Sequence, residues 1–196
     1  MLKPFVIIDS TPSGHFVVNG DRLTGHNEAI RCFMSPFDAC IEAVQIATPD
    51  QPKEVIPVSS INRHAIRNKS PDQIQFTVHV AWRAHQFRIP VRPCGRPFAT
   101  ALPLQKRLQG EWISMMPDAE ALAHIESIHE RAGLFAWKET ALDFRRWRPE
   151  RVAEMAKHAL RELAGITTRR RLFDECDQYA LFDPEFGQWH FVPVDG

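Results

Sequence analysis

The chain has 196 residues, of which 44% are hydrophobic and 24% are charged, and its formal net charge at pH 7 is zero. These values are typical of a globular protein and argue against a disordered chain. The apolar runs are too short for a membrane-spanning helix, and the N-terminus lacks the pattern of a signal peptide. We therefore expect a cytoplasmic protein with one domain over residues 1–196 and no membrane association.

Three β runs open the chain. Residues 4–9 and 15–18 are rich in Val, Ile and Phe and flank a turn-forming cluster at 10–14, so we expect them to pair as a hairpin. Residues 29–34 form the third candidate strand. An early helix should follow at once, because Ser35 can cap it and Pro36 suits its first position. It should end near Ala47.

The next region is expected to be β-rich, with its clearest strand at 74–84. A short strand at 54–58 contains Pro57, which favours an edge position. In the long strand the even-numbered residues should face the core. The odd-numbered ones, including His79, should be solvated or paired with acidic residues of flanking helices. The hydrophobic alternation changes parity near 84–86, where the absence of Gly, Pro and Asn favours a bulge or a sharp bend over a tight turn. Five Pro or Gly residues between 90 and 103 are expected to break regular structure.

The C-terminal half is predicted to be helical and then to return to β structure. Helices are expected at 117–133, 138–147 and 149–165, and a hairpin should join 179–182 to 189–192. The predicted fold class is α+β. It has a mainly antiparallel N-terminal sheet with one early helix, a helical segment at about 117–165, and a C-terminal β-hairpin that packs back on the sheet. The corresponding sub-regions are 1–113, 114–168 and 169–196.

Searches for catalytic motifs in the sequence gave no match. The glycine-rich patterns of nucleotide-binding loops, the nucleophile elbow of α/β-hydrolases and the H-E-x-x-H pattern of zinc proteases are all absent. The four cysteines form no C-x-x-C pair. Glu126 and His129 have the spacing of a di-iron ligand pair, but no second such motif accompanies them. We therefore expect no cofactor and no metal, and the sequence favours a non-enzymatic protein over an enzyme.

Positive charge is concentrated in one region. Residues 61–113 contain nine Lys or Arg and two Asp or Glu side chains. Such a region is a candidate surface for an anionic partner, although the acidic flanks of the chain could also neutralise it. A second group of arginines lies between the last two predicted helices. The candidate anion- or partner-binding residues are Arg83, Arg88, Arg92, Arg96, Arg145, Arg146 and Arg148.

Two histidines on the long strand are the candidates for catalysis. His79 and His85 could act as acid or base, because histidine titrates near neutral pH. Six residues of extended strand would separate their Cα atoms by about 20 Å, so each would need a different partner. A hydrolase that uses His79 or His85 with an unidentified carboxylate is therefore one alternative.

The favoured function is that of a bacterial cytoplasmic binding or accessory protein, which contacts nucleic acid or another anionic partner through residues 61–113. Arginine outnumbers lysine by 18 to 6, which suggests a bacterial source. The other alternative is a protein-interaction module of the inhibitor or immunity type. An exposed apolar patch around Trp137, Phe144 and Trp147 would support it. The choice between protein and nucleic acid as the partner stays open, and the sequence does not indicate an oligomeric state.

Overall fold

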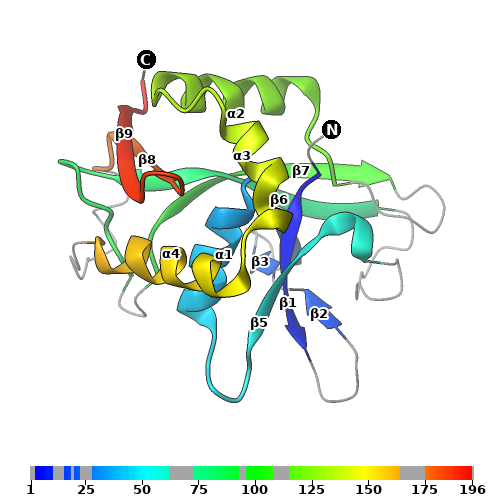
Figure 1. The fold of residues 1–196 in the computed structure, drawn as a ribbon. Coiled ribbons are helices and arrows are strands. Elements are labelled where there is room, and N and C mark those ends of the chain that lie inside the picture. Colours follow the sequence, from blue (N-terminus) through cyan, green and yellow to red (C-terminus); the bar gives the residue numbers. More distant parts are fainter. Residues whose placement is uncertain are drawn as a thin grey trace.

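The computed structural model describes residues 3–10, 16–18, 20–22, 28–61, 73–92, 96–107, 115–163 and 175–195 (Figure 1). Within these ranges the chain folds around a nine-stranded sheet whose main path runs β2-β1-β4-β6-β8-β9. β3 pairs with β4, β5 with β1 and β7 with β6. The strands are β1 (Phe5–Ser10), β2 (Phe16–Val18), β3 (Gly20–Arg22), β4 (Glu28–Phe33), β5 (Lys53–Pro57), β6 (Gln73–Ala84), β7 (Ala99–Arg107), β8 (Gln178–Asp183) and β9 (Gln188–Pro193).

The predicted fold class is confirmed. Every strand pair is antiparallel except β4 with β6, which is parallel. β1 and β2 form the expected N-terminal hairpin, and β5, which contains Pro57, pairs only with β1. The C-terminal hairpin of β8 and β9 joins the sheet because β8 pairs with β6.

Helices cover the sheet on both faces (Figure 1). α1 (Pro36–Ile46) and α4 (Pro149–Arg161) pack with Trp82 on one face, whereas α2 (Ala119–Arg131) packs with Val78 on the other. α3 (Trp137–Asp143) and a 3₁₀ turn at Phe144–Arg146 connect α2 to α4. Each described helix is too short and too polar to cross a membrane.

The helix boundaries follow the capping signals closely. The Ser35 hydroxyl accepts a hydrogen bond from the Asp38 backbone N–H at 3.3 Å, and Pro36 occupies the first turn of α1. Asp118 caps α2 in the same way, so this helix begins two residues after Pro117. Gly133 follows α2 with φ of 76°, a conformation that favours glycine. The expected stop at Gly165 lies outside the described residues.

Strand β7 was not predicted from the sequence, because its proline was expected to break regular structure. β7 runs through Pro103, which lies opposite Thr77 of β6. Since β7 pairs only with β6, it forms an edge of the sheet, where a proline leaves no ladder hydrogen bond unmade on its outer side. The short strand β3 was also not predicted, because its first residue, Gly20, belongs to an Asn-Gly pair that is typical of turns.

The alternation predicted for the long strand is wrong in its second half. The register of β6 against β7 shifts between His79 and Ala81, so Val80 is an extra residue in β6. Before this bulge, odd-numbered residues face α1. After it, Trp82 and Ala84 face α1 and α4 instead. Both faces of the strand are covered, and Thr77, His79 and Ala81 are buried rather than solvated.

The parity change near 84–86 has a different cause from the one predicted. Residues 85–88 form a tight turn, in which the backbones of His85 and Arg88 exchange hydrogen bonds of 2.9 and 3.0 Å. Gln86 and Phe87 both have positive φ, 50° and 59°, as a type I′ turn requires. Contacts with the C-terminal hairpin hold this unfavourable geometry. The Phe87 N–H donates to the Gln178 side chain at 2.9 Å, and its ring meets Phe191.

Candidate ligand-binding pocket at a split in the sheet

A pocket of about 150 Å³ lies where β6 changes its neighbour. One edge of β6 pairs with β4 up to His79 and then with β8 from Trp82 onward. Between these positions the end of β4, which leads into α1, diverges from the end of β8, which leads into the hairpin turn. Three segments line the opening: Ser35, Phe37 and Asp38; His129, residues 133–137 and Thr140; and residues 181–186.

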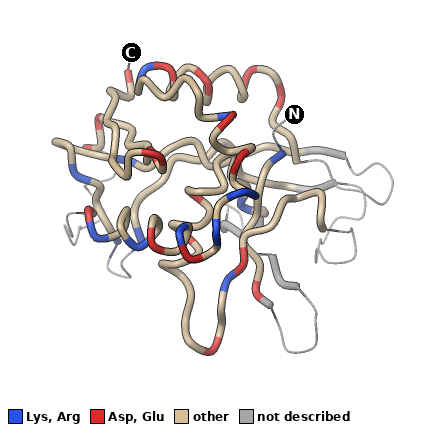
Figure 2. Tube along the Cα trace, viewed as in Figure 1, with Lys and Arg blue, Asp and Glu red and all other residues tan. Residues whose placement is uncertain are grey.

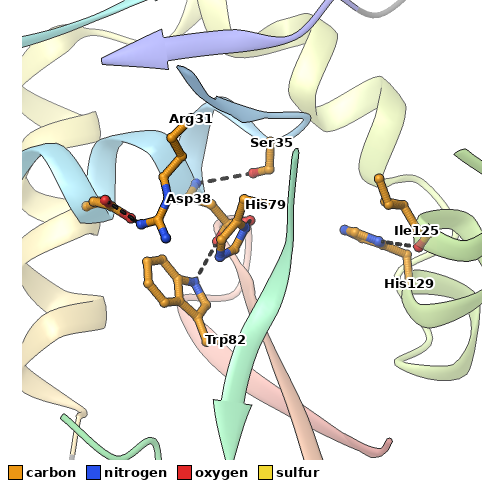
Figure 3. Close-up of polar contacts among 8 residues, drawn as sticks. Arg31, Ser35, Asp38, His79, Trp82, Ile125 and His129 are labelled. Carbon is orange, nitrogen blue, oxygen red and sulfur yellow. Dashed lines mark hydrogen bonds and ion pairs between the residues drawn. The ribbon is translucent and has the colours of Figure 1, made fainter. Parts of the chain in front are cut away.

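The bulge in β6 brings two side chains onto Asp38, which lies in the first turn of α1. His79 and Trp82 are three residues apart, so a regular strand would place them on opposite faces. With the extra Val80, both face α1 (Figure 3). The Trp82 indole N–H donates to Asp38 Oδ1 at 3.0 Å, and His79 Nδ1 lies 3.9 Å from Oδ2. Their rings are 4.6 Å apart.

Burial dominates the electrostatics of this cluster. It raises the pKa of Asp38 to about 7, although hydrogen bonds from Trp82 and Ser35 act in the opposite direction. Burial also holds the pKa of His79 well below its usual value, helped by the positive charge of Arg31. Arg31 is itself held by Glu42, with both carboxylate oxygens at 2.6 Å. At neutral pH His79 is therefore uncharged, and Asp38 is close to its titration midpoint.

His129, from α2, supplies a hydrogen-bond acceptor on the other side of the split. Its Nδ1 lies 2.9 Å from the Ile125 carbonyl oxygen, so Nδ1 carries the proton and Nε2 is an acceptor. The second ring nitrogen is on the side of the ring that faces Asp38 and His79 (Figure 3). Burial lowers the pKa of His129 to about 4, and its ring stacks on Trp137 at 4.3 Å. His129 is thus neutral under physiological conditions.

The β8–β9 turn forms the third wall. Asp183 Oδ1 accepts hydrogen bonds from the backbone N–H groups of Glu185 at 2.8 Å and Phe186 at 3.3 Å, which fixes the turn. The Thr140 hydroxyl donates to Glu185 Oε1 at 2.8 Å and so connects the turn to α3. The two walls are therefore joined across the pocket.

The pocket lining has a consistent chemical character. Its charged residues are acidic (Asp38, Asp183 and Glu185), its one histidine is neutral, and Lys and Arg do not occur among the lining residues. Five aromatic side chains complete the walls: Phe37, Phe135, Trp137, Phe182 and Phe186. Within the described ranges, no group of three His, Cys, Asp or Glu side chains is placed to hold a metal ion. The pocket therefore presents acceptors and aromatic surface to a ligand.

The two predicted histidines lie in different environments. His79 has a carboxylate partner in Asp38, but its side chain is only 2% exposed and does not line the pocket. His85 lies in the tight turn, with Nδ1 3.3 Å from Asp177 on the surface. Sequence reasoning could not identify either carboxylate, because both belong to segments remote in the chain. The structure does not bring the two histidines into one site.

The predicted arginines lie outside the pocket and form two groups. Arg83 is half-buried over the Tyr179 ring, 5.2 Å from its centroid. Arg88, Arg92 and Arg96 are exposed, and in the described part of the chain none of the three has a carboxylate partner. Arg92 stacks on Phe98 at 5.1 Å. Whether these arginines bind an anion stays a prediction.

The second arginine group precedes α4. Arg145, Arg146 and Arg148 are exposed, and Arg146 pairs with Asp143 at 3.1 Å. Along α4 itself, basic and acidic positions alternate (Figure 2), so this helix has no face of one charge. Three further basic residues of the region 61–113, Arg63, Arg67 and Lys69, lie outside the described residues, as do the side chains of Lys106 and Arg107. The run of three arginines at Arg169–Arg171, another candidate for anion binding in the sequence, also lies outside them.

The predicted aromatic patch is not a free surface. Trp137, Phe144 and Trp147 are each half-buried, and they pack against the core clusters. Trp137 instead forms part of the pocket wall.

Sequence reasoning missed the pocket itself. Asp38 lies in a segment that was predicted only as the start of a helix. His129 was considered as a metal ligand and otherwise expected in an exposed helix pair, whereas it is buried. Neither residue carries a local signal of this site, since the pocket combines residues from α1, α2, α3 and the β8–β9 turn. No known protein family, no curated protein and no solved structure matches this chain, so its function is argued from the pocket and the surface alone.

Proposed function

We propose that this protein is a non-enzymatic binding protein whose pocket takes a cationic nitrogen group, either an ammonium or a guanidinium. The observation that carries the proposal is the lining, which combines three carboxylates, a neutral histidine and five aromatic rings with no Lys or Arg. Ligands with N–H donors and positive charge are the complement of such a surface.

Each polar wall favours a donor. His129 Nε2 is an acceptor because Nδ1 is committed to the Ile125 carbonyl. Glu185 is exposed and accepts a hydrogen bond from the Thr140 hydroxyl on Oε1. Asp38 is near its titration midpoint at neutral pH because burial raises its pKa to about 7. A bound cation would favour the ionised form of Asp38, and the attraction between the two charges would increase the affinity of the pocket for the cation.

The volume of the pocket favours a small group over a large ligand. The volume of about 150 Å³ equals that of an engineered protein cavity that accommodates benzene. A guanidinium or ammonium with a short alkyl chain fits such a space, with the aromatic rings around its apolar part. Binding is favoured over catalysis because His79, the predicted histidine that lies beside Asp38, is buried and does not line the pocket.

Calorimetric titration with N-butylguanidinium tests the proposal, with N-butylurea as the uncharged ligand of the same shape. We expect a dissociation constant of about 1 mM or tighter for the cation, and binding at least about tenfold weaker for the urea. Glu185→Gln should weaken cation binding about three- to tenfold, because it removes a charged acceptor. The control Glu154→Gln, on the exposed side of α4, should change nothing. Equal binding of cation and urea would refute the proposal.

A second candidate function is supported by a different surface. Arg88, Arg92 and Arg96 are exposed without carboxylate partners among the described residues, and Phe87 beside them is 70% exposed. Exposed arginines next to an aromatic ring are suited to single-stranded nucleic acid, which offers phosphates and stacking bases. The paired variant Arg88→Glu/Arg92→Glu should weaken binding of a fluorescent oligothymidine at least tenfold, whereas Arg145→Glu should not. Unchanged affinity would exclude this surface.

A bacterial, cytoplasmic setting belongs to the same proposal. It is supported by the excess of arginine over lysine and by the free thiols of Cys32 and Cys40, which suit a reducing compartment.

A further inference from the structure

Two phenylalanines at the pocket are unusually exposed. Phe135, in the α2–α3 connection, is 76% exposed, and Phe186, in the β8–β9 turn, is 77% exposed. They are the most exposed large hydrophobic residues in the described part of the chain, and both line the pocket. An acidic, aromatic pocket is thus flanked by apolar surface that the protein itself leaves in water.

We propose that the cation in the pocket is the arginine side chain of a protein partner, and that apolar residues flanking this arginine cover Phe135 and Phe186. This inference rests on the proposed function, since it names the molecule to which the bound cationic group belongs. The charge of the pocket and the apolar surface beside it are the two properties that such a partner must complement.

An arginine suits the pocket better than a lysine. The acceptors come from separate elements, with Asp38 on α1, His129 on α2 and Glu185 in the hairpin turn. A guanidinium carries five N–H donors in a planar fork and can reach acceptors in several directions. A guanidinium is also more weakly hydrated than an ammonium, so it enters a pocket lined by aromatic rings more readily.

A protein partner explains the exposed rings better than a free small molecule does. A ligand that fits inside about 150 Å³ has little surface left to cover two rings that extend into solvent. Protein interfaces commonly combine one buried Arg anchor with surrounding contacts that exclude water. The Thr140–Glu185 hydrogen bond joins the segments that carry the two phenylalanines, so the surface is held in place before binding.

The test uses the full chain and an immobilised library of capped heptapeptides. The central residue is arginine, citrulline or lysine, and the flanking positions are either Leu/Phe mixtures or Ser/Gly mixtures. We expect arginine peptides with apolar flanks to bind at least tenfold more strongly than the citrulline peptides and the Ser/Gly-flanked peptides. Phe135→Ser/Phe186→Ser should abolish the gain from apolar flanks, measured within this variant as the ratio of the affinities for apolar-flanked and Ser/Gly-flanked arginine peptides. Leu142→Ser, an exposed residue that does not line the pocket, is the matched control.

The outcomes separate this inference from the proposed function. If N-butylguanidinium binds but the apolar flanks add nothing, or the double variant keeps the gain, the inference is wrong and the cation pocket stands. If lysine peptides bind as well as arginine peptides, the assignment to arginine is wrong. If neither the peptides nor N-butylguanidinium binds, both proposals fail. Because Phe135 and Phe186 are exposed, the double variant should keep the thermal midpoint of the native protein, which circular dichroism can verify.

Discussion

The pocket and the turn at residues 85–88 lie at the two ends of the second half of β6, yet their charged side chains have opposite signs. Between them β6 runs only from the bulge at Val80 to Ala84, the residue before the turn. The pocket offers carboxylates and aromatic walls, whereas the turn and the segment after it offer Arg88, Arg92 and Arg96. Both regions depend on the C-terminal hairpin, through Glu185 in one case and Gln178 in the other.

This difference shows which kind of site a sequence can reveal. The arginines are neighbours in the chain, so a simple charge count finds them. The pocket has no local signature, because the bulge, the split and the hairpin turn bring its parts together only after folding. A protein whose formal net charge is zero therefore carries two surfaces of opposite charge, one visible in the sequence and one not.

The largest expected difference between the two regions is in stability. Trp82 is 1% exposed and donates its indole N–H to Asp38, so Trp82→Ala should lower the free energy of unfolding by about 3–5 kcal/mol. Phe87→Ala, in the exposed turn, should lower it by less than about 1 kcal/mol. Urea denaturation of both variants measures the comparison. Similar losses would show that the turn contributes as much to stability as the buried Trp82, which donates to Asp38 beside the pocket.

The next prediction concerns pH. The folded pKa of Asp38, about 7, lies above its ordinary value of 3.8, so the unfolded chain releases this proton first. Asp38 therefore lowers the free energy of unfolding as pH rises from about 4 to about 7, by up to about 1.4 kcal/mol per unit. Asp38→Asn removes this term, and its stability relative to the native protein should rise across that window. His129 and His79 act in the opposite direction below pH 6.5, but they cancel because both proteins contain them.

Urea denaturation at several pH values measures this difference. A relative stability of Asp38→Asn that falls with rising pH would mean that the folded protein favours the ionised carboxylate, contrary to the burial argument.

The smallest effect is expected in the turn. Gln86 has a φ of 50°, a conformation that asparagine tolerates better than glutamine does. Gln86→Asn should therefore raise the free energy of unfolding by about 0.5–1 kcal/mol, measured by thermal or urea denaturation. Gln51→Asn, at an exposed position with negative φ, should give no gain. A loss of stability in Gln86→Asn would show that the Gln86 side chain contributes more than its backbone strain.

The parts of the fold that could be predicted are those with local causes. Ser35 and Pro36 indicate the start of α1, and Pro149 indicates the start of α4. Alternating hydrophobic residues indicate β6 and the terminal hairpin. The failures had tertiary causes. Pro103 is tolerated in β7 because this strand lies at an edge of the sheet. Val80 is an extra residue in β6, a strand that is covered on both faces. Gln86 and Phe87 adopt positive φ because contacts with Gln178 and Phe191 stabilise the turn.

The same division applies to the candidate site. His79 was identified as a candidate from its place on the clearest strand, but its partner Asp38 was not, because only the bulge and the packing of α1 bring them together. Arg88, Arg92 and Arg96 were identified, but their lack of carboxylate partners in the described part of the chain needed the structure.

The most direct test of the cation pocket is the titration of the Asp38 carboxyl carbon by NMR, with and without saturating N-butylguanidinium, assigned with Asp38→Asn. A cation in the pocket favours the ionised carboxylate, so the pKa of Asp38 should fall from about 7 by roughly one unit, equal to a tenfold higher affinity for the ionised form. N-butylurea should leave it unchanged. A pKa of Asp38 that is unaffected by the cation, or raised by it, would contradict the account.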